Sequence, residues 1–315
     1  MTAALGRIVA TRVAAVMLLA CVGCATLQSN RPLARAAEGQ TTRHTLAVNG
    51  RSRSYYLRLP PGLSATQRAP LLILLHGHNN NGSNVIRQSR LAPVADRQHV
   101  ILVAPNGTGR FSRLGLTWNV GTCCGSAQSH HVDDVAFLAA LVDTLAAHLP
   151  VDRAHITIAG FSAGGMLALR AACDQSGIAD AFVNVQGTMP DTTCRPSHPV
   201  SMLLIAGDAD EDMIEEHAEN ASHHGRAFSV SAMGTLQFWK HHNGCDSALD
   251  HHEGHEYTEY DATGCAPGTV TRLIVVHGHP HAWPGGRRSW FLAPSPNPDV
   301  DADALIFDFL AAADR

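Results

Sequence analysis

The hydrophobic positions of the chain fall into short apolar runs separated by longer amphipathic segments. Six runs are almost continuously apolar, at residues 71–76, 100–105, 155–160, 181–186, 201–206 and 272–277. Such runs are typical of strands that are buried on both faces of a parallel sheet. A seventh segment, residues 54–60, alternates between apolar and polar positions, which predicts a half-buried strand.

Helical patterns lie between several of these runs. Residues 133–149 begin with two aspartates and then place apolar side chains three to four positions apart. Similar patterns follow Ser162 and occupy residues 301–313 near the end of the chain. The alternation predicts an α/β fold in which a mostly parallel central sheet carries helices on both faces. No linker to a separate lid domain is apparent in the sequence.

Composition narrows the class of protein. The 315 residues are 45% hydrophobic, which is enough for a single α/β domain with a substantial core. A formal net charge of -4 and the absence of a Lys/Arg run argue against a nucleic-acid partner. The histidine-rich stretch at residues 241–260 contains neither HExxH nor a paired CxxC. It is therefore interpreted as a solvated loop, and no metal site is predicted.

The N-terminus is typical of an export signal. Arg7 and Arg12 precede or flank an apolar stretch, residues 13–22, that is too short to span a membrane. Small residues before Cys21 and Cys24 are similar to a bacterial lipobox, and either cysteine could carry the lipid. Lipidation at Cys24 would leave six cysteines without lipid, an even number, whereas lipidation at Cys21 would leave Cys24 as an extra thiol, which favours Cys24. A cleaved signal without lipid is the alternative.

These features predict three segments. Residues 1–24 form a lipoprotein-type signal peptide, residues 25–41 a polar tether, and residues 42–315 the α/β domain. The protein is expected in the periplasm or outside the cell, held to the outer membrane if the lipobox is used. In that oxidising environment its cysteines can form disulfides.

One apolar run ends in a motif with chemical meaning. The sequence GFSAG, from Gly160 to Gly164, follows a predicted strand and precedes a predicted helix. Glycines two residues to either side of Ser162 allow strand and helix to pass closely around a sharp turn. The helix N-terminus favours negative charge that develops beside the serine. The stretch therefore predicts a nucleophile elbow with Ser162 at its apex.

A serine nucleophile needs a base and an acid that orients the base. On this fold they follow the serine in the order acid, then histidine. The run at 201–206 is followed by three candidate acids, and the run at 272–277 leads into three candidate bases. The acids are Asp208, Asp210 and Asp212, and the bases are His277, His279 and His281. Position alone does not choose among them.

The predicted mechanism also requires an oxyanion hole. One donor is expected to be the backbone N–H of Ala163, directly after the nucleophile. The other is expected in the loop after an early strand, where the backbone N–H of His78 follows LLILLHG. The neighbouring His76 is interpreted as structural.

Taken in order, these motifs resemble the exported esterase and polyhydroxybutyrate depolymerase family, which includes feruloyl and acetylxylan esterases. The resemblance spans residues 43–312 and rests on LLHGHNNNG, TWNVGTCCGSAQSHHVDDVAFL, ITIAGFSAGGMLAL, LLIAGDADEDM, WKHHNGC and GHPHAWPGG. It implies the α/β-hydrolase fold. It also selects Asp210 as the acid, from a G-T-x-D pattern in which Asp208 replaces threonine, and His281 as the base before an xWPG turn. Residues 213–215 depart from the family, as does His78, which stands where a small residue or cysteine is common.

The resemblance implies further roles for cysteines and tryptophans. Disulfides are expected between Cys173 and Cys194 and between Cys245 and Cys265. The adjacent Cys123 and Cys124 form either a vicinal disulfide or two thiols that are free or differently paired. Trp118, beside the NVGTCCG loop, and Trp283, in the xWPG turn, are expected to shape the substrate pocket.

The predicted function is that of an exported serine carboxylic-ester hydrolase without a cofactor. The expected substrates are hydroxyalkanoate oligomers or feruloyl and acetyl esters. An acyltransferase or peptidase on the same fold is one alternative. A catalytically inactive, lipid-anchored binding protein is an alternative of another class.

Overall fold

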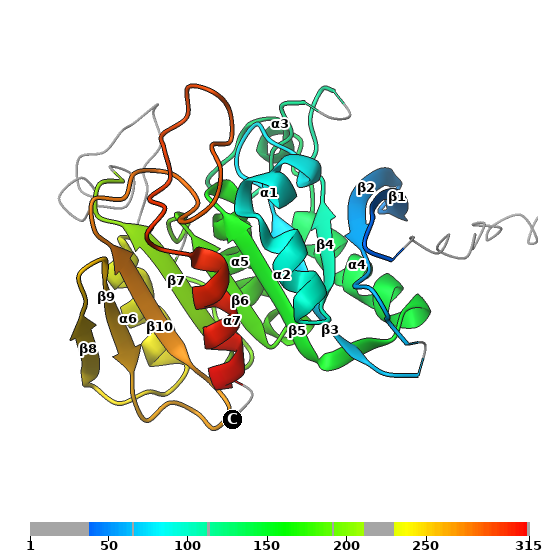
Figure 1. Ribbon diagram of the computed structural model, residues 1–315. Helices are drawn as coiled ribbons and strands as arrows, with labels where there is room; N and C mark the ends of the chain where they lie inside the picture. The colour runs from blue at the N-terminus through cyan, green and yellow to red at the C-terminus, as the bar shows by residue number, and fades with distance from the viewer. Residues whose placement is uncertain (1–37, 65, 112–113, 191, 211–229, 314–315) are drawn as a thin grey trace, which may run out of the picture. The chain divides into compact units, whose positions relative to one another are not determined.

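The computed structural model describes residues 38–64, 66–111, 114–190, 192–210 and 230–313 (Figure 1). The predicted signal peptide, most of the predicted tether, Cys21, Cys24 and Asp212 lie outside the described residues. No helix in the described ranges is long and apolar enough to cross a bilayer.

Within the described residues, ten strands form one sheet in the order β1-β2-β4-β3-β5-β6-β7-β10-β9-β8. The six central strands run parallel; they are β4, β3, β5, β6, β7 and β10. The strands at both edges of the sheet pair antiparallel. The bounds are β1 Thr41–Val48, β2 Arg51–Arg58, β3 Ala69–Leu75, β4 Ile101–Pro105, β5 Val151–Phe161, β6 Ala181–Val185, β7 Ser201–Gly207, β8 Leu249–Glu253, β9 Tyr257–Ala262 and β10 Thr271–Val276. The expected α/β fold with a mostly parallel sheet is confirmed.

Helices cover both faces of this sheet (Figure 1). One layer contains α1 (Gly82–Ser89), α2 (Leu91–Arg97) and α7 (Ala302–Ala313), whose apolar side chains share a core with one sheet face. The other layer contains α4 (Asp134–His148), α5 (Ala163–Asp174) and α6 (Ala232–His242). A short helix, α3 (Gly125–Ser129), and a 3-10 turn, Ser176–Ile178, lie in connections.

The seven predicted strands correspond to β2, β3, β4, β5, β6, β7 and β10. The central ones are buried along their length, as their apolar sequences require. Strands β1, β8 and β9 were not predicted, because they lie toward the sheet edges and carry polar side chains at exposed and half-exposed positions. Edge strands gain less from burial, so their hydrophobic pattern is weak.

The histidine-rich stretch is not a loop, which corrects the expectation from its composition. It comprises the end of α6 and the hairpin β8–β9, which extends the sheet by antiparallel pairing with β10. The strand β8 is almost fully exposed, so its histidines face solvent from an ordered edge. Among the described residues, no three His, Cys, Asp or Glu side chains converge as metal ligands would.

The N-terminal boundary of the fold lies a few residues earlier than predicted. The N–H of Gly39 donates to the carbonyl of Leu59 at 2.9 Å, and the Glu38 carboxylate accepts from the N–H of Gly62 at 2.8 Å. Strand β1 starts at Thr41, inside the segment expected to be tether. The last residues of that segment therefore belong to the folded domain.

Candidate active site

Ser162 lies at the turn between β5 and α5 in a strained backbone conformation. Its φ is 54° and its ψ is -122°, a region that L side chains rarely adopt. A Cβ on Gly160 would lie 2.2 Å from the backbone carbon of Gly164, and one on Gly164 would lie 2.4 Å from the carbonyl oxygen of Leu75. Only glycine permits these approaches, so the GFSAG spacing is required by the packing of strand against helix.

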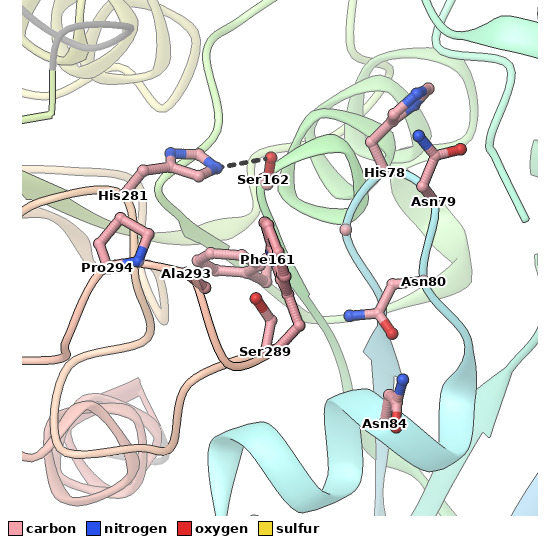
Figure 2. A pocket seen from close by; sticks show the side chains of 12 residues that line it. His78, Asn79, Asn80, Asn84, Phe161, Ser162, His281, Ser289, Ala293 and Pro294 are labelled. Carbon is pink, nitrogen blue, oxygen red and sulfur yellow. Dashed lines mark hydrogen bonds between the residues drawn. The ribbon is translucent and has the colours of Figure 1, made fainter. Parts of the chain in front are cut away.

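His281 connects Ser162 with Asp210. Its Nε2 lies 2.9 Å from the Ser162 hydroxyl (Figure 2), and its Nδ1 lies 2.6 Å from a carboxylate oxygen of Asp210. Asp210 is 2% exposed and follows β7, whereas His281 follows β10 and its side chain is 34% exposed. Since β6 separates β5 from β7 in the sheet, loops from three separate strand ends meet at this edge.

The other candidate acids and bases have different partners. The carboxylate of Asp208 accepts from the N–H of Gly278 at 2.6 Å. The His277 ring contacts the Thr258 hydroxyl at 2.9 Å. His279 is fully buried, and its Nε2 donates to the carbonyl of Ala282 while its Nδ1 accepts from the N–H of Asn297. Burial lowers the pKa of His279, which keeps this ring neutral as a structural tie.

The loop after β3 brings His78 to the same site. His78 lines the cavity that contains Ser162 and His281 (Figure 2). Ala163 is the first residue of α5, and the N–H groups of a first helical turn have no partner inside the helix. The two residues whose backbone N–H groups are expected to form the oxyanion hole therefore both lie next to the turn that contains Ser162.

His76 anchors the first residues of the loop after β3 through hydrogen bonds to neighbouring segments. Its Nε2 accepts from the N–H of Gly107 at 3.0 Å, and its carbonyl accepts from the Trp118 indole at 2.8 Å. The ring is fully buried, and this burial lowers the pKa of His76 to about 4. His76 is thus a neutral structural group, as the sequence suggested.

A cavity of about 570 Å³ opens above Ser162 and His281. On one side it is lined by the side-chain amides of Asn79, Asn80 and Asn84, from the loop after β3 and the start of α1. Apolar side chains also line it, namely Phe161, Trp290, Ala293 and Pro294. Figure 2 shows the asparagines and Pro294 on opposite sides of Ser162. The cavity therefore offers polar and apolar contacts around one reactive hydroxyl.

Comparison with known proteins identifies the family. Residues 47–261 match the family model Esterase, described as "Putative esterase". The match covers more than half of the chain. The chain belongs to this esterase family.

Two curated relatives agree with this assignment, and a solved structure shares the fold. The esterase is 30% identical over 268 residues to the Nocardia uniformis subsp. tsuyamanensis protein named "Putative esterase NocK", covering 79% of this chain and 76% of that protein. It is 25% identical to feruloyl esterase B of Piromyces equi over 76% of this chain but only 44% of that protein. An acetyl xylan esterase structure from Aspergillus awamori shares the fold with a TM-score of 0.58 at 14% identity, covering 85% of this chain and 99% of that one.

The two tryptophans expected in the substrate pocket of the esterase lie elsewhere. Trp118 and Trp283 are fully buried, and neither is among the residues that line the cavity. The Trp283 indole donates to the Asp303 carboxyl group at 3.0 Å, and the Trp118 indole donates to the backbone carbonyl of His76. Each of these large side chains fills the protein core behind a loop that lines the cavity, and in this way supports that loop.

Apart from His78, Ser162 and His281, the residues that line the cavity carry no clear signal in the sequence. Trp290 comes from the segment after the xWPG turn, and Asn79, Asn80 and Asn84 from the HNNNG loop and helix start. In the sequence the asparagine run is only one part of the motif LLHGHNNNG. Its position after an early strand was the available clue, because that loop also supplies His78.

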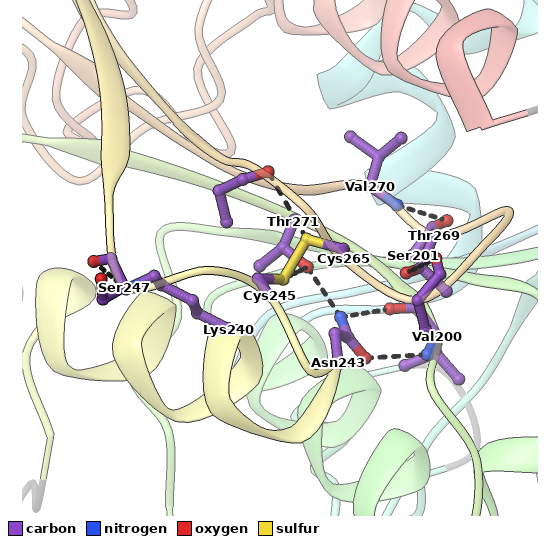
Figure 3. The surroundings of a disulfide bond; sticks show 12 residues. Val200, Ser201, Lys240, Asn243, Cys245, Ser247, Cys265, Thr269, Val270 and Thr271 are labelled. Carbon is purple, nitrogen blue, oxygen red and sulfur yellow. Dashed lines mark hydrogen bonds between the residues drawn. A yellow bond between two sulfur atoms is a disulfide. The ribbon is translucent and has the colours of Figure 1, made fainter.

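The structure joins all six cysteines of the folded domain in pairs. Cys173 pairs with Cys194, Cys245 with Cys265 (Figure 3), and Cys123 with its neighbour Cys124. The Cys245–Cys265 pair ties the chain after α6 to the segment before β10. Both cysteines of the vicinal pair are almost fully buried, and the N–H of Cys124 donates to the carbonyl of Trp118 at 3.0 Å.

Proposed function

We propose that this esterase is an exported carboxylic-ester hydrolase that acts through an acyl-enzyme on Ser162. The observation that carries the proposal is the position of His281, whose two ring nitrogens lie 2.9 Å from the Ser162 hydroxyl and 2.6 Å from the Asp210 carboxylate. Nucleophile, base and acid thus have the mutual geometry that activates a serine hydroxyl.

The proposed reaction proceeds in two halves. Ser162 Oγ attacks the ester carbonyl carbon while His281 Nε2 accepts the hydroxyl proton, and the N–H groups of His78 and Ala163 stabilise the oxyanion. His281 then gives that proton to the departing alcohol, leaving the acyl group on Ser162. Water, deprotonated by His281, attacks the acyl-enzyme, and His281 returns this proton to Ser162 Oγ as the bond to the acyl group breaks and the acid is released. Asp210 keeps the imidazole oriented and stabilises its protonated form.

The proposed substrates are feruloyl or acetyl esters, or hydroxyalkanoate oligomers. The names of the relatives support the first two, since they include a feruloyl esterase and an acetyl xylan esterase. The cavity supports esters with both a hydroxylated and an apolar part, because asparagine amides line it together with Trp290 and Pro294.

Ser162→Ala tests the mechanism. The variant should fold normally, lose turnover of nitrophenyl esters and fail to react with a fluorophosphonate probe. Steady turnover by folded Ser162→Ala would show that another group is the nucleophile. A probe-inert parent protein would favour an inactive binding protein, whereas acyl transfer to added alcohols in preference to water would favour an acyltransferase.

A substrate panel tests the specificity. Nitrophenyl esters of increasing acyl length, methyl ferulate, acetylated xylan and hydroxybutyrate oligomers should be compared by kcat/KM, each with Ser162→Ala as blank. Rates on methyl ferulate or acetylated xylan above those on simple nitrophenyl esters of equal reactivity would support a plant-ester substrate. The reverse order would contradict it.

Export and lipid attachment at Cys24 form part of the proposal. The three cysteine pairs of the folded domain support export, because disulfides persist in oxidising compartments. Expression of the full chain in a bacterium with a clickable fatty acid tests the anchor. Loss of label in Cys24→Ala but not in Cys21→Ala would support attachment at Cys24, and an unlabelled parent chain would indicate a plain cleaved signal.

A further inference from the structure

Gln186 occupies an unusual place directly after β6. It is 1% exposed, and its φ of 57° lies in the left-handed region, which is uncommon for a residue with a Cβ. Its backbone N–H donates to the carbonyl of Ile205 in β7 at 2.8 Å. The preceding residue, Val185, accepts from the N–H of Ser162 at 2.8 Å. Gln186 is therefore held next to the nucleophile turn by its own main chain.

The side-chain amide of Gln186 spans two loops that are far apart in the sequence. Its Oε1 accepts from the N–H of Gly207 at 3.0 Å, and its Nε2 donates to the carbonyl of Pro280 at 3.1 Å. Gly207 begins the turn that contains Asp210, since its carbonyl accepts from the N–H of Asp210 at 3.2 Å. Pro280 directly precedes His281.

The two loops also touch each other at Gly207. A Cβ on Gly207 would lie 2.0 Å from the carbonyl oxygen of His279 and 3.0 Å from Nε2 of Gln186. Asp208 adds an exposed link between the same loops through the N–H of Gly278. Gln186, which is itself buried, supplies a second link between these loops.

We propose that Gln186 is a positioning residue that sets the distance between Asp210 and His281. The inference rests on the proposed function, because it assigns these two residues the roles of acid and base. An amide has one acceptor and one donor end, so Gln186 can satisfy a backbone N–H and a backbone carbonyl at once. Misplacement of catalytic groups by about 1 Å can cost on the order of 10²-fold in rate.

Two variants separate the parts of this amide. Gln186→Met has a similar length and removes both hydrogen bonds. Gln186→Glu keeps the acceptor for the Gly207 N–H but presents a second oxygen to the Pro280 carbonyl. We expect kcat to fall by about 10- to 100-fold in both variants. KM should change by less than about threefold, because Gln186 does not line the cavity. The rate of fluorophosphonate labelling should fall in parallel with kcat.

A matched control is available near the first residues of β7 and β10, at the ends of these strands opposite to the proposed site. Asn243 is also a buried amide, and it bridges the N–H and carbonyl of Val200 and the hydroxyl of Thr271 (Figure 3). Asn243→Leu should lower the melting temperature as much as Gln186→Met does. Its folded fraction should keep kcat within about twofold of the parent, since these contacts lie far from the reacting groups.

The outcomes are distinct. An inactive Ser162→Ala together with a Gln186→Met variant that keeps kcat within about twofold would overturn the positioning role alone. An equal loss of kcat in folded Asn243→Leu would overturn it as well, because general destabilisation would then suffice. Failure of both Gln186 variants to fold would assign the amide to overall stability, against the proposal. Turnover by Ser162→Ala would instead refute the proposed function.

Discussion

The imidazole of His281 lies 2.6 Å from the carboxylate of Asp210 although 71 positions of sequence separate the two residues. This contact joins the loop after β7 to the loop after β10, two strands that are parallel neighbours in the sheet. Because Asp210 is almost fully buried, its charge is poorly screened by water and acts mainly on the ring that contacts it. The pair therefore defines the orientation of the proposed base.

Replacement of Asp210 by asparagine tests the importance of this contact. An amide can hold the imidazole in the wrong tautomer and cannot stabilise the imidazolium, so kcat should fall by about 10⁴-fold at neutral pH. The measurement is kcat on a nitrophenyl ester, with circular dichroism to verify folding. Asp208→Asn provides the control, since Asp208 contacts Gly278 and not His281. A larger loss in Asp208→Asn would reassign the acid.

Two exposed aromatic residues after the xWPG turn allow substrate binding to be tested separately from the chemical step. Trp290 lines the cavity, whereas Phe291, although 78% exposed, does not. Trp290→Ala should raise KM for large aromatic esters by about tenfold with kcat nearly unchanged, because the lost contacts stabilise substrate and transition state alike. Phe291→Ala should leave KM as it is. Steady-state kinetics on methyl ferulate and nitrophenyl acetate would measure both.

Asp303 should make the stability of the protein fall as pH rises. Burial raises the pKa of Asp303 to about 8, far above its value in the unfolded chain. Between about pH 4 and 8 the folded protein holds a proton that the unfolded chain has lost. The free energy of unfolding should therefore fall by up to about 1.4 kcal/mol per pH unit from this group. Urea unfolding of the parent and Asp303→Asn at pH 5 and 7.5 measures the difference between the two slopes. Equal slopes in both proteins would contradict it.

His76 should have the opposite effect. Burial lowers the pKa of His76 to about 4, so the folded protein keeps the ring neutral while the unfolded chain protonates it below about pH 6.5. Its contribution to the free energy of unfolding is complete above pH 6.5 and is lost as the pH falls toward 4. His76→Gln should unfold with a weaker acid dependence than the parent. Urea midpoints between pH 4.5 and 7 provide the measurement, and an unchanged dependence would exclude His76 as the source.

The Cys245–Cys265 pair should contribute to stability without affecting catalysis. The two cysteines are 20 positions apart, and closing a loop of that length stabilises by about 3 kcal/mol in the chain-entropy model. The double variant Cys245→Ser/Cys265→Ser should lose about that free energy of unfolding. Its kcat should match the parent, because the pair lies at the opposite end of β10 from His281. A large loss of kcat with unchanged stability would contradict this assignment.

Much of the architecture follows from local patterns. Each central strand is a short apolar run, and such a run is stable only when both faces are buried, so β3 through β7 and β10 could be read directly. The strands β1, β8 and β9 could not, because polar edge strands form through pairing with a neighbour that the sequence does not name. The hairpin β8–β9 shows this clearly, since its histidines suggested a loop.

The site divides in the same way. The elbow around Ser162 is local, since two glycines within five positions determine how closely β5 and α5 approach. The sequence alone also limited the acid and the base to two short loops. By contrast, the burial of Trp118 and Trp283 and the exposure of Trp290 in the cavity depend on which loops stack over one another. No pattern within a single loop contains that information.

The sequence by itself determined the class of fold, the sharp serine turn and membership of the esterase family, because each depends on local patterns and on the order of these patterns along the chain. Only the tertiary structure decided that His281 lies 2.9 Å from Ser162, 119 positions away, and that Gln186 links the two loops beside them. The reason is that these contacts join residues that follow different strands of the sheet, namely β5, β6, β7 and β10. Strand order and register, which arise from the packing of the whole sheet, set such lateral distances.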